Sequence, residues 1–505
     1  MNINYISIFH NNYANPKKMT IKNSLLNIAL AITLLIGLGG FFLMDTDLWD
    51  GIIVAHAIAV GRPDVYHEWF SEAGLFFTPY IYDVVYLARS LVGYELLAKF
   101  FSISFLILAS IEVGKLVTRY FKVPPNIVFF TAFLFFLSPA WVLYYSNIYL
   151  MHSFSLFVTL IATRYILDRK ALFLALPALL LSFQQSSNAP LSISLILLSC
   201  VYIHTQRRER IINAAIILFI IIGFFALRKL FPTFGLYATY NKIELYNLIS
   251  IKMYARYFIY FALLYFPLFC FMLITLWHSK TTHLIKLFSV IISGIMLNGV
   301  AYIAVGKLPS FYEIGLIHAE SLRFTFTSTV FAVLLLPSIW QGLAGHPRTR
   351  EIFLLLVMIC ACSINLLAHE GKMKEVIFQR GMIHELKTMP ELPACIVNIK
   401  SVGVGALTNY EYGNMFYKAY GRVILFPLSD SSEPYSDTIQ QYELLKKESY
   451  RHKYIVPQQQ PTCLVNLHIF TELNKLSLLN TLYIYFTFKE DSVVNLNVAL
   501  DNQHR

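Results

Sequence analysis

Charged side chains are scarce in this sequence, where Asp, Glu, Lys and Arg make up 14% of the 505 residues. A soluble domain normally carries about 25% charged residues. Hydrophobic residues make up 57% of the chain, and the mean hydropathy is +0.58. They are grouped in runs of about twenty residues, the length of helix that crosses the hydrocarbon core of a bilayer. The composition therefore argues against a soluble globular protein and predicts a multi-pass membrane protein.

The sequence also lacks the short motifs of several large protein classes. It contains no Walker motif, no glycine-rich dinucleotide turn, no HExxH and no GxSxG. ATP-driven transport and common hydrolase chemistry therefore have no support. Its six cysteines show no spacing typical of a metal site. The net charge of +11 comes mainly from short loops between apolar runs, a pattern that orients membrane helices and argues against nucleic acid as a partner.

Eleven apolar runs have the length of a membrane span, and the loops between them alternate in charge. The loops on one side contain groups of Arg and Lys, such as Arg207, Arg208 and Arg210. The positive-inside rule makes this side cytoplasmic, together with the N-terminus, and the odd number of spans puts the C-terminus outside. The expected spans lie at about residues 24–44, 97–117, 126–145, 150–166, 171–187, 190–204, 211–228, 254–277, 285–306, 325–343 and 352–368.

The long outer loop at residues 45–96 follows the first span and is rich in carboxylates. Its sequence predicts two short helices, one on each side of a break at Gly61. Glu68 and Glu72 are four residues apart and are expected on one helix face. Aromatic residues such as Trp69 are expected to hold these helices at the membrane interface. A loop of this length and polarity is more typical of an active site than of a connector.

The composition changes near residue 371, and we expect a small α/β domain at 371–505 after a transmembrane domain at 1–370. Cys395 and Cys463 fall on predicted strands in an oxidising compartment, which favours a disulfide, with two free buried thiols as the alternative. The expected strands are 394–399, 422–428, 463–469 and 482–488, and the expected helices are 410–420 and 437–450.

The first span is followed at once by Asp45-Thr46-Asp47, with Trp49 close behind. Carboxylates at the mouth of a membrane helix are costly to keep there without a function. This motif, the long first outer loop, about ten further spans and an outer C-terminal domain resemble the GT-C glycosyltransferases. The resemblance covers the architecture of the whole chain, whereas its residue-level match is confined to this motif.

The resemblance implies an all-α polytopic membrane bundle of about eleven transmembrane helices with a small C-terminal periplasmic α/β domain. It further implies an enzyme of the bacterial inner membrane with a polyprenyl-phosphate-linked sugar as its donor. The acceptor would be a periplasmic glycan such as O-antigen or another surface polysaccharide. The sugar, the acceptor and the linkage are not encoded in any motif of the sequence.

Two chemical roles follow for a glycosyltransferase of this kind. A carboxylate takes the proton from the acceptor hydroxyl, and the resemblance assigns this role to Asp47, with Asp45 as the second candidate. Cationic groups stabilise the departing phosphate. The motif leaves open whether a divalent cation such as Mg²⁺ or Mn²⁺ takes part, with Asp45 and Asp47 as its ligands.

The candidate phosphate ligands lie at the outer ends of later spans. Arg323 stands beside Glu320 at the entrance of the tenth span, where an arginine can hold a phosphate with two hydrogen bonds. Lys252 and Arg256 flank the entrance of the eighth span. Anchoring of a helix at the membrane interface is the alternative role for these cations.

The remaining candidates for substrate binding come from the first outer loop. They are His56, Glu68 and Glu72. The alternative for the histidine is a satisfied structural side chain, and for the glutamates an ordinary solvated helix face. Their place in the same loop as Asp47 is the reason for including them.

Two other functions compete with sugar transfer. An O-antigen-type polymerase would use a lipid-diphosphate-linked oligosaccharide, and it usually lacks an outer C-terminal domain of this size. A flippase or transporter of lipid-linked sugars would need charged residues inside its spans, and few are present, Glu112 and Lys115 among them. A scaffold whose C-terminal domain does the work is a weaker third alternative.

Overall fold

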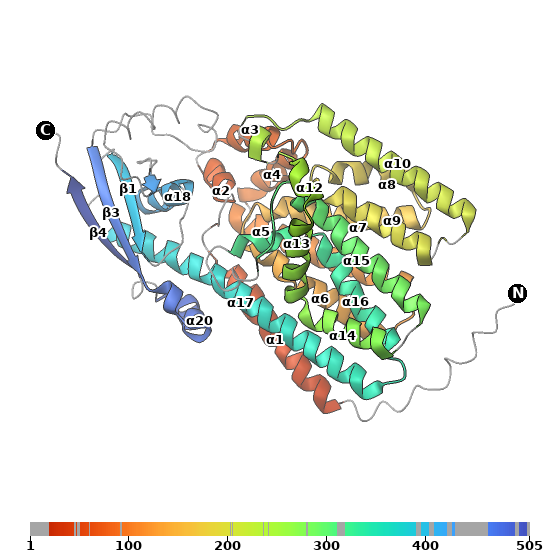
Figure 1. Ribbon diagram of the computed structural model, residues 1–505. Coiled ribbons are helices and arrows are strands. Elements are labelled where there is room, and N and C mark those ends of the chain that lie inside the picture. The colour runs from red at the N-terminus through yellow and green to blue at the C-terminus, as the bar shows by residue number, and fades with distance from the viewer. Residues whose placement is uncertain are drawn as a thin grey trace, which may run out of the picture.

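The computed structural model consists mainly of helices gathered in one bundle, with a small β-sheet at one end (Figure 1). The described residues are 20–44, 47, 51–59, 61–90, 93–202, 204, 206–235, 237–240, 242–278, 281–310, 319–389, 395–402, 409–421, 427–429, 463–489 and 494–501.

Five of the described helices are long and apolar enough to cross a bilayer. They are α5 (Tyr94–Tyr120), α7 (Tyr149–Leu167), α10 (Arg207–Leu230), α15 (Thr282–Ile303) and α17 (Pro347–Thr388). A sixth candidate is the pair α13 (Ile251–Leu264) and α14 (Phe266–His278), which bends by 96° at its break. This set agrees with the predicted helical membrane bundle.

Other apolar helices complete the bundle. They are α1 (Thr20–Phe42), α6 (Pro125–Phe136), α8 (Leu172–Ser182), α9 (Asn188–Tyr202) and α16 (Ser328–Gly342). Short connecting helices are η3 (Pro139–Tyr145), α11 (Tyr237–Tyr240), α12 (Leu245–Ile249) and η5 (Ala319–Thr325). Each of the eleven predicted spans overlaps one of these helices or the bent pair, and the number of spans stays a prediction.

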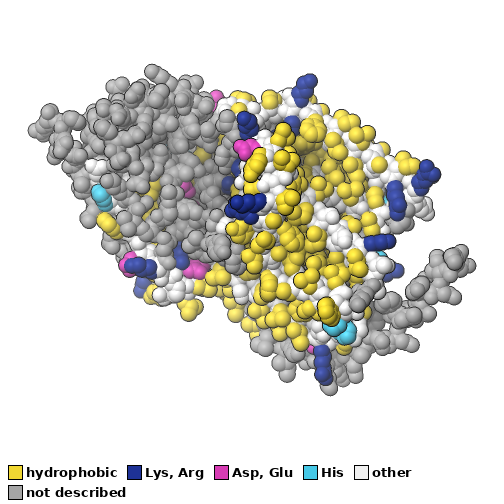
Figure 2. All heavy atoms as spheres, in the orientation of Figure 1, with side chains coloured by type: hydrophobic (Ala, Val, Ile, Leu, Met, Phe, Trp, Pro, Cys, Tyr) yellow, Lys and Arg dark blue, Asp and Glu magenta, His cyan; other side chains and the backbone are white. Residues whose placement is uncertain are grey.

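The outer face of the bundle is apolar. Figure 2 shows hydrophobic side chains gathered over the helices, with Lys and Arg mostly at the margins of this surface. Large apolar side chains such as Trp277, Phe173 and Phe225 are among its exposed residues. A soluble protein rarely exposes such a continuous apolar surface, whereas a lipid-facing surface has this composition.

The first outer loop forms a small helical subdomain. It contains α2 (Gly51–Ala59), α3 (Pro63–Glu72), α4 (Thr78–Leu87) and η2 (Ala88–Ser90). The two predicted helices are confirmed, and α4 is an additional one. The expectation for Trp69 is wrong, because this side chain is buried in the apolar core shared by α2, α3 and α4 and donates to Tyr237 Oη at 2.5 Å.

α17 extends well beyond the predicted span. Residues 369–388 contain several good helix formers, mainly Glu, Lys and Met, and no proline, so they favour helix. The helix ends before Pro390, where Met389 is extended, as expected of a residue that precedes proline. The division predicted at residue 370 therefore falls inside one continuous helix, and the boundary between the two predicted domains stays a prediction.

A four-stranded sheet lies beyond the end of α17. β1 (Cys395–Val402) pairs in parallel with β2 (Pro427–Ser429) and β3 (Cys463–Thr471), and β4 (Val494–Asp501) pairs antiparallel with β3. α17 packs against α18 (Asn409–Tyr420), α20 (Leu478–Thr487) and β4, which attaches the sheet to the bundle (Figure 1).

The strands predicted near 394–399 and 463–469 and the helix near 410–420 are confirmed, whereas the strand predicted at 482–488 is wrong. That segment belongs to α20, where Thr481, Ile484 and Tyr485 are buried with the spacing of a helix face. Ser477 Oγ accepts from Asn480 N and caps this helix. The helix predicted at 437–450 lies outside the described residues.

The sheet register leads to a test of the predicted disulfide. Cys395 lies opposite Cys463 in the parallel pair of β1 and β3. Neighbouring strands are about 4.8 Å apart, within the roughly 4.4–6.8 Å that a disulfide requires between Cα atoms. We expect mass spectrometry of a non-reducing digest to find the two cysteine peptides linked. Recovery of both as free thiols from protein alkylated before lysis would contradict the pairing.

Candidate functional site

Asp47 is fully buried at the start of the first outer loop. Asn147 N donates to Asp47 Oδ1 at 3.0 Å, two residues before α7 begins. The first backbone N–H groups of a helix have no partner within the helix, and its dipole favours a negative charge at this end. The N-terminal end of α7 therefore provides a favourable place for this carboxylate inside the protein.

Tyr82 binds the backbone carbonyl of Asn147, the residue whose N–H binds Asp47. Tyr82 Oη donates to the carbonyl oxygen of Asn147 at 2.7 Å, and the side chain is fully buried on α4. Burial raises the pKa of Tyr82 well above its usual value, and the nearby Asp47 charge raises it further. Tyr82 therefore stays protonated and holds the peptide that binds Asp47.

Gly51, the first residue of α2, closes over the carboxylate. A Cβ atom at this position would lie 2.9 Å from Asn147 N and closer still to Asp47 Oδ1 and Ser146 Oγ. Only a residue without a side chain leaves room for this approach. The absence of a side chain at Gly51 thus lets the first loop cover Asp47.

Replacement of Gly51 by alanine should destabilise the protein by about 1–3 kcal/mol, the usual cost of overpacking a filled site. The thermal unfolding midpoint of the purified protein measures this effect. Gly93 in the same loop is the matched control, since a Cβ there meets no atom within 4 Å. Equal midpoints for Gly51→Ala and Gly93→Ala would show that α2 does not pack tightly on Asp47.

Arg323 reaches the same end of α7 from η5. Its charge lies within electrostatic range of Tyr149 and His152, both in the first turn of α7. Phe326, directly after η5, packs on the same turn of α7. Its ring centroid lies 5.7 Å from that of His152 and 6.1 Å from that of Tyr149. The predicted anion Asp47 and the predicted cation Arg323 are thus both gathered around the N-terminal end of α7.

No protein-family model matches this chain. The curated proteins contain no significant match to it either. The functional interpretation therefore depends on the chemistry of the residues around Asp47.

Two buried cations that the sequence analysis did not single out lie at the end of α1, just before Asp47. Lys99, 1% exposed on α5, donates to the carbonyl of Met44 at 3.4 Å. Arg380 on α17 donates to the carbonyl of Leu43 at 2.5 Å. Cations near the last carbonyls of a helix are favourable. A lysine inside a predicted span is costly to bury. This cost could have singled out Lys99 as a functional or structural residue from the sequence.

The other predicted binding residues are not gathered at this point. Lys252 and Arg256 are exposed on α13, and Glu68 is exposed on α3. Glu72 is buried, with its carboxylate close to Gly235, so the two glutamates do not share an exposed face. Asp45 and the Glu320 side chain lie outside the described residues.

His56, on α2, contacts the C-terminal part of the chain. It hydrogen-bonds Asn414 and packs on Tyr417 of α18, with 4.6 Å between ring centroids. Burial lowers the pKa of His56 to about 4, against the opposing effect of the Asn414 hydrogen bond. His56 is therefore a neutral hydrogen-bonding group at neutral pH, unsuited to binding a phosphate by charge.

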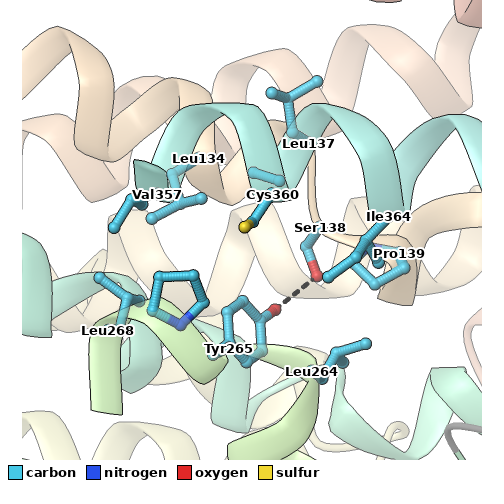
Figure 3. Close-up of a pocket in the computed structure, with 12 residues that line it drawn as sticks. Leu134, Leu137, Ser138, Pro139, Leu264, Tyr265, Leu268, Val357, Cys360 and Ile364 are labelled. Carbon is cyan, nitrogen blue, oxygen red and sulfur yellow. Dashed lines mark hydrogen bonds between the residues drawn. The ribbon is translucent and has the colours of Figure 1, made fainter. Parts of the chain in front are cut away.

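A small cavity lies at the bend between α13 and α14 and is shown in Figure 3. Its volume is about 20 Å³, space for roughly one water molecule. Tyr265 Oη is hydrogen-bonded to Ser138 Oγ at 2.7 Å and to Thr329 Oγ1 at 2.9 Å. The cavity is too small for a sugar, and its lining does not include Asp47.

A divalent cation would need further ligands beside Asp47. Among the residues that the structure describes, no three His, Cys, Asp or Glu side chains are grouped as metal ligands. Asp47 alone does not make a metal site, so no step of the chemistry below is assigned to a metal. The predicted participation of Asp45 lies outside the described part of the chain.

Proposed function

We propose that this protein is an integral membrane glycosyltransferase of the GT-C type. It would transfer a sugar from a polyprenyl-phosphate-linked donor to a glycan acceptor on the outer side of the bacterial inner membrane. The proposal includes eleven spans, a cytoplasmic N-terminus and a periplasmic C-terminal α/β domain. The helices that overlap each predicted span and the sheet beyond α17 support this architecture.

One observation carries the chemical part of the proposal. A fully buried carboxylate, Asp47, and a half-buried guanidinium, Arg323, both lie around the N-terminal end of α7. In the proposed topology this is the outer end of the helix, where the lipid headgroups begin. Groups of opposite charge in a site shielded from water interact more strongly than they would in solution.

The proposed step is a substitution at the anomeric carbon of the donor. The acceptor oxygen forms a bond to this carbon while Asp47 takes the hydroxyl proton. The bond from the anomeric carbon to the phosphate oxygen breaks, and its electron pair leaves with the polyprenyl phosphate. Arg323 stabilises the negative charge that gathers on the phosphate.

Lys252 and Arg256 have a different place in this scheme. Both are exposed on α13 beside apolar residues such as Ile259, which is also exposed. A helix with exposed apolar and cationic residues suits the membrane surface, where the cations meet lipid phosphates. We therefore assign them to the approach of the lipid-linked donor and not to the site of transfer.

The test is a transfer assay with the full-length protein in lipid nanodiscs and a panel of labelled polyprenyl-phosphate sugars. We expect at least one donor to pass its sugar to a glycan acceptor and release polyprenyl phosphate. If the protein is reconstituted into vesicles, movement of the donor from one leaflet to the other without transfer would instead identify a flippase. Consumption of a lipid-diphosphate oligosaccharide alone would favour the polymerase.

A further inference from the structure

Asn147 has a fully buried side chain whose polar atoms make no hydrogen bond within the described part of the chain. Its backbone N–H is bonded to Asp47 and its carbonyl to Tyr82. Its side-chain Oδ1 and Nδ2 are both buried without a partner. Buried polar groups in folded proteins nearly always have a partner, so an amide without one calls for a ligand or a water.

Buried polar atoms without a partner also lie beside α2, at His56. His56 Nε2 is buried without a partner, and so is Nδ2 of the Asn414 side chain that bonds His56. Gly51 and His56 are five residues apart on α2, or about 7.5 Å along the helix axis. Unpartnered hydrogen-bonding groups therefore flank this short helix near both of its ends.

All of these groups are neutral, which restricts the chemistry of a ligand. An amide offers a donor and an acceptor, and a neutral imidazole offers one of each. A hydroxyl group is likewise both donor and acceptor, so a sugar with neighbouring hydroxyls matches them. The nearby buried cations Lys99 and Arg380 already donate to the carbonyls of Met44 and Leu43. Their charges are not cancelled by these neutral carbonyls, but the Asp47 carboxylate lies directly beside Asn147 and disfavours a second anion there.

We propose that α2 is flanked by a binding site for a neutral saccharide, in which Asn147 bonds the sugar next to Asp47 and His56 with Asn414 bonds the sugar that follows. The inference rests on the proposed function, because it identifies this saccharide as the acceptor. The half-buried Tyr417 ring beside His56 offers an apolar face for a sugar ring. Since Asp47 and Asn147 are fully buried, the first loop has to open to admit the saccharide.

The substitution Asn147→Leu tests the site cleanly, because the backbone bonds to Asp47 and Tyr82 do not depend on the side chain. The probes are methyl glycosides of glucose, galactose and N-acetylglucosamine. Saturation-transfer NMR on the full-length protein in nanodiscs measures their binding without any donor. We expect at least one glycoside to bind, and its affinity to fall about tenfold or more in Asn147→Leu, as for the loss of one or more good hydrogen bonds. His56→Phe keeps a ring beside Tyr417. It is expected to weaken binding of a disaccharide that contains the sugar of the best-bound methyl glycoside.

The thermal midpoint separates this loss from misfolding. Asn147→Leu removes two polar atoms without partners, so the midpoint should be unchanged or higher. Asn298 is the control. It is fully buried and its Oδ1 is also without a partner, but Nδ2 donates to Ser194 Oγ and to the Gly294 carbonyl. Asn298→Leu should lower the midpoint and leave glycoside affinity unchanged.

Three outcomes would overturn the inference. They are no binding by any glycoside, equal affinities in wild type and Asn147→Leu, and an equal loss of affinity in Asn298→Leu. Because binding is measured without the lipid donor, it is independent of transfer. Sugar binding without transfer from any donor would contradict the proposed enzyme activity and support the saccharide site. Transfer without sugar binding would support the enzyme activity and contradict the site.

Discussion

Replacing Asp47 by asparagine should lower the rate of sugar transfer by about 10²–10⁴-fold, the range expected when a general base is lost. In the wild type, Asn147 N donates to Asp47 Oδ1 at 3.0 Å. The Oδ1 of the introduced asparagine can accept the same hydrogen bond. The geometry at the start of α7 would then survive while the proton acceptor is removed. The turnover of wild type and variant with the best donor of the panel measures the effect.

Asp64 in the same loop is the matched control for Asp47. It is exposed on α3 and bonded to Arg62 at 2.7 Å. Asp64→Asn changes the same functional group in the same loop and should leave turnover unchanged. If Asp47→Asn keeps full turnover as well, Asp47 is only a structural partner of α7, and the assigned base is wrong.

Replacing Glu375 by alanine should lower the free energy of unfolding by about 3–5 kcal/mol, the usual cost of removing one partner from a buried ion pair. Glu375 is bonded to Lys372 on α17 at 3.0 Å, and the two side chains are 2% and 0% exposed. The variant leaves the ammonium group buried without this carboxylate. Unfolding in SDS of the purified protein in mixed micelles measures the loss.

The chain contains an exposed pair with the same spacing. Glu472 and Lys475 are also three residues apart and 2.7 Å from each other, but both side chains are more than two-thirds exposed. Glu472→Ala should leave the unfolding curve unchanged, because water screens such a pair. The double variant Lys372→Met, Glu375→Leu should recover most of the stability. Equal effects at the two pairs would show that the 370–380 segment of α17 is not buried.

Much of the local structure was predictable because it depends on neighbours in the sequence. Apolar runs of span length mark the helices of the bundle, and the breaking residue Gly61 separates α2 from α3. The strands at β1 and β3 follow from short β-rich segments. The segment of α20 was misassigned because a short apolar run fits a strand and a helix equally well.

The polar interior was harder to predict. Lys99 was overlooked because it lies inside an apolar run, and Glu375 because the change of composition near residue 371 was taken as the start of a separate domain. Both are buried by segments distant in the sequence, α1 in the first case and the elements packed on α17 in the second. No local pattern reveals that a charged side chain has such a neighbour.

The sequence by itself determined that this protein is a helical membrane protein with an acidic motif after its first span. Those features follow from the cost of placing polar groups in hydrocarbon, which acts on each segment separately. Only the tertiary structure decided that Asp47 is buried, because its partner Asn147 is a hundred residues away. It likewise decided that Arg323 shares the end of α7, whereas Lys252 and Arg256 do not. The location of a charge depends on which helices pack together, and that packing is a property of the whole bundle.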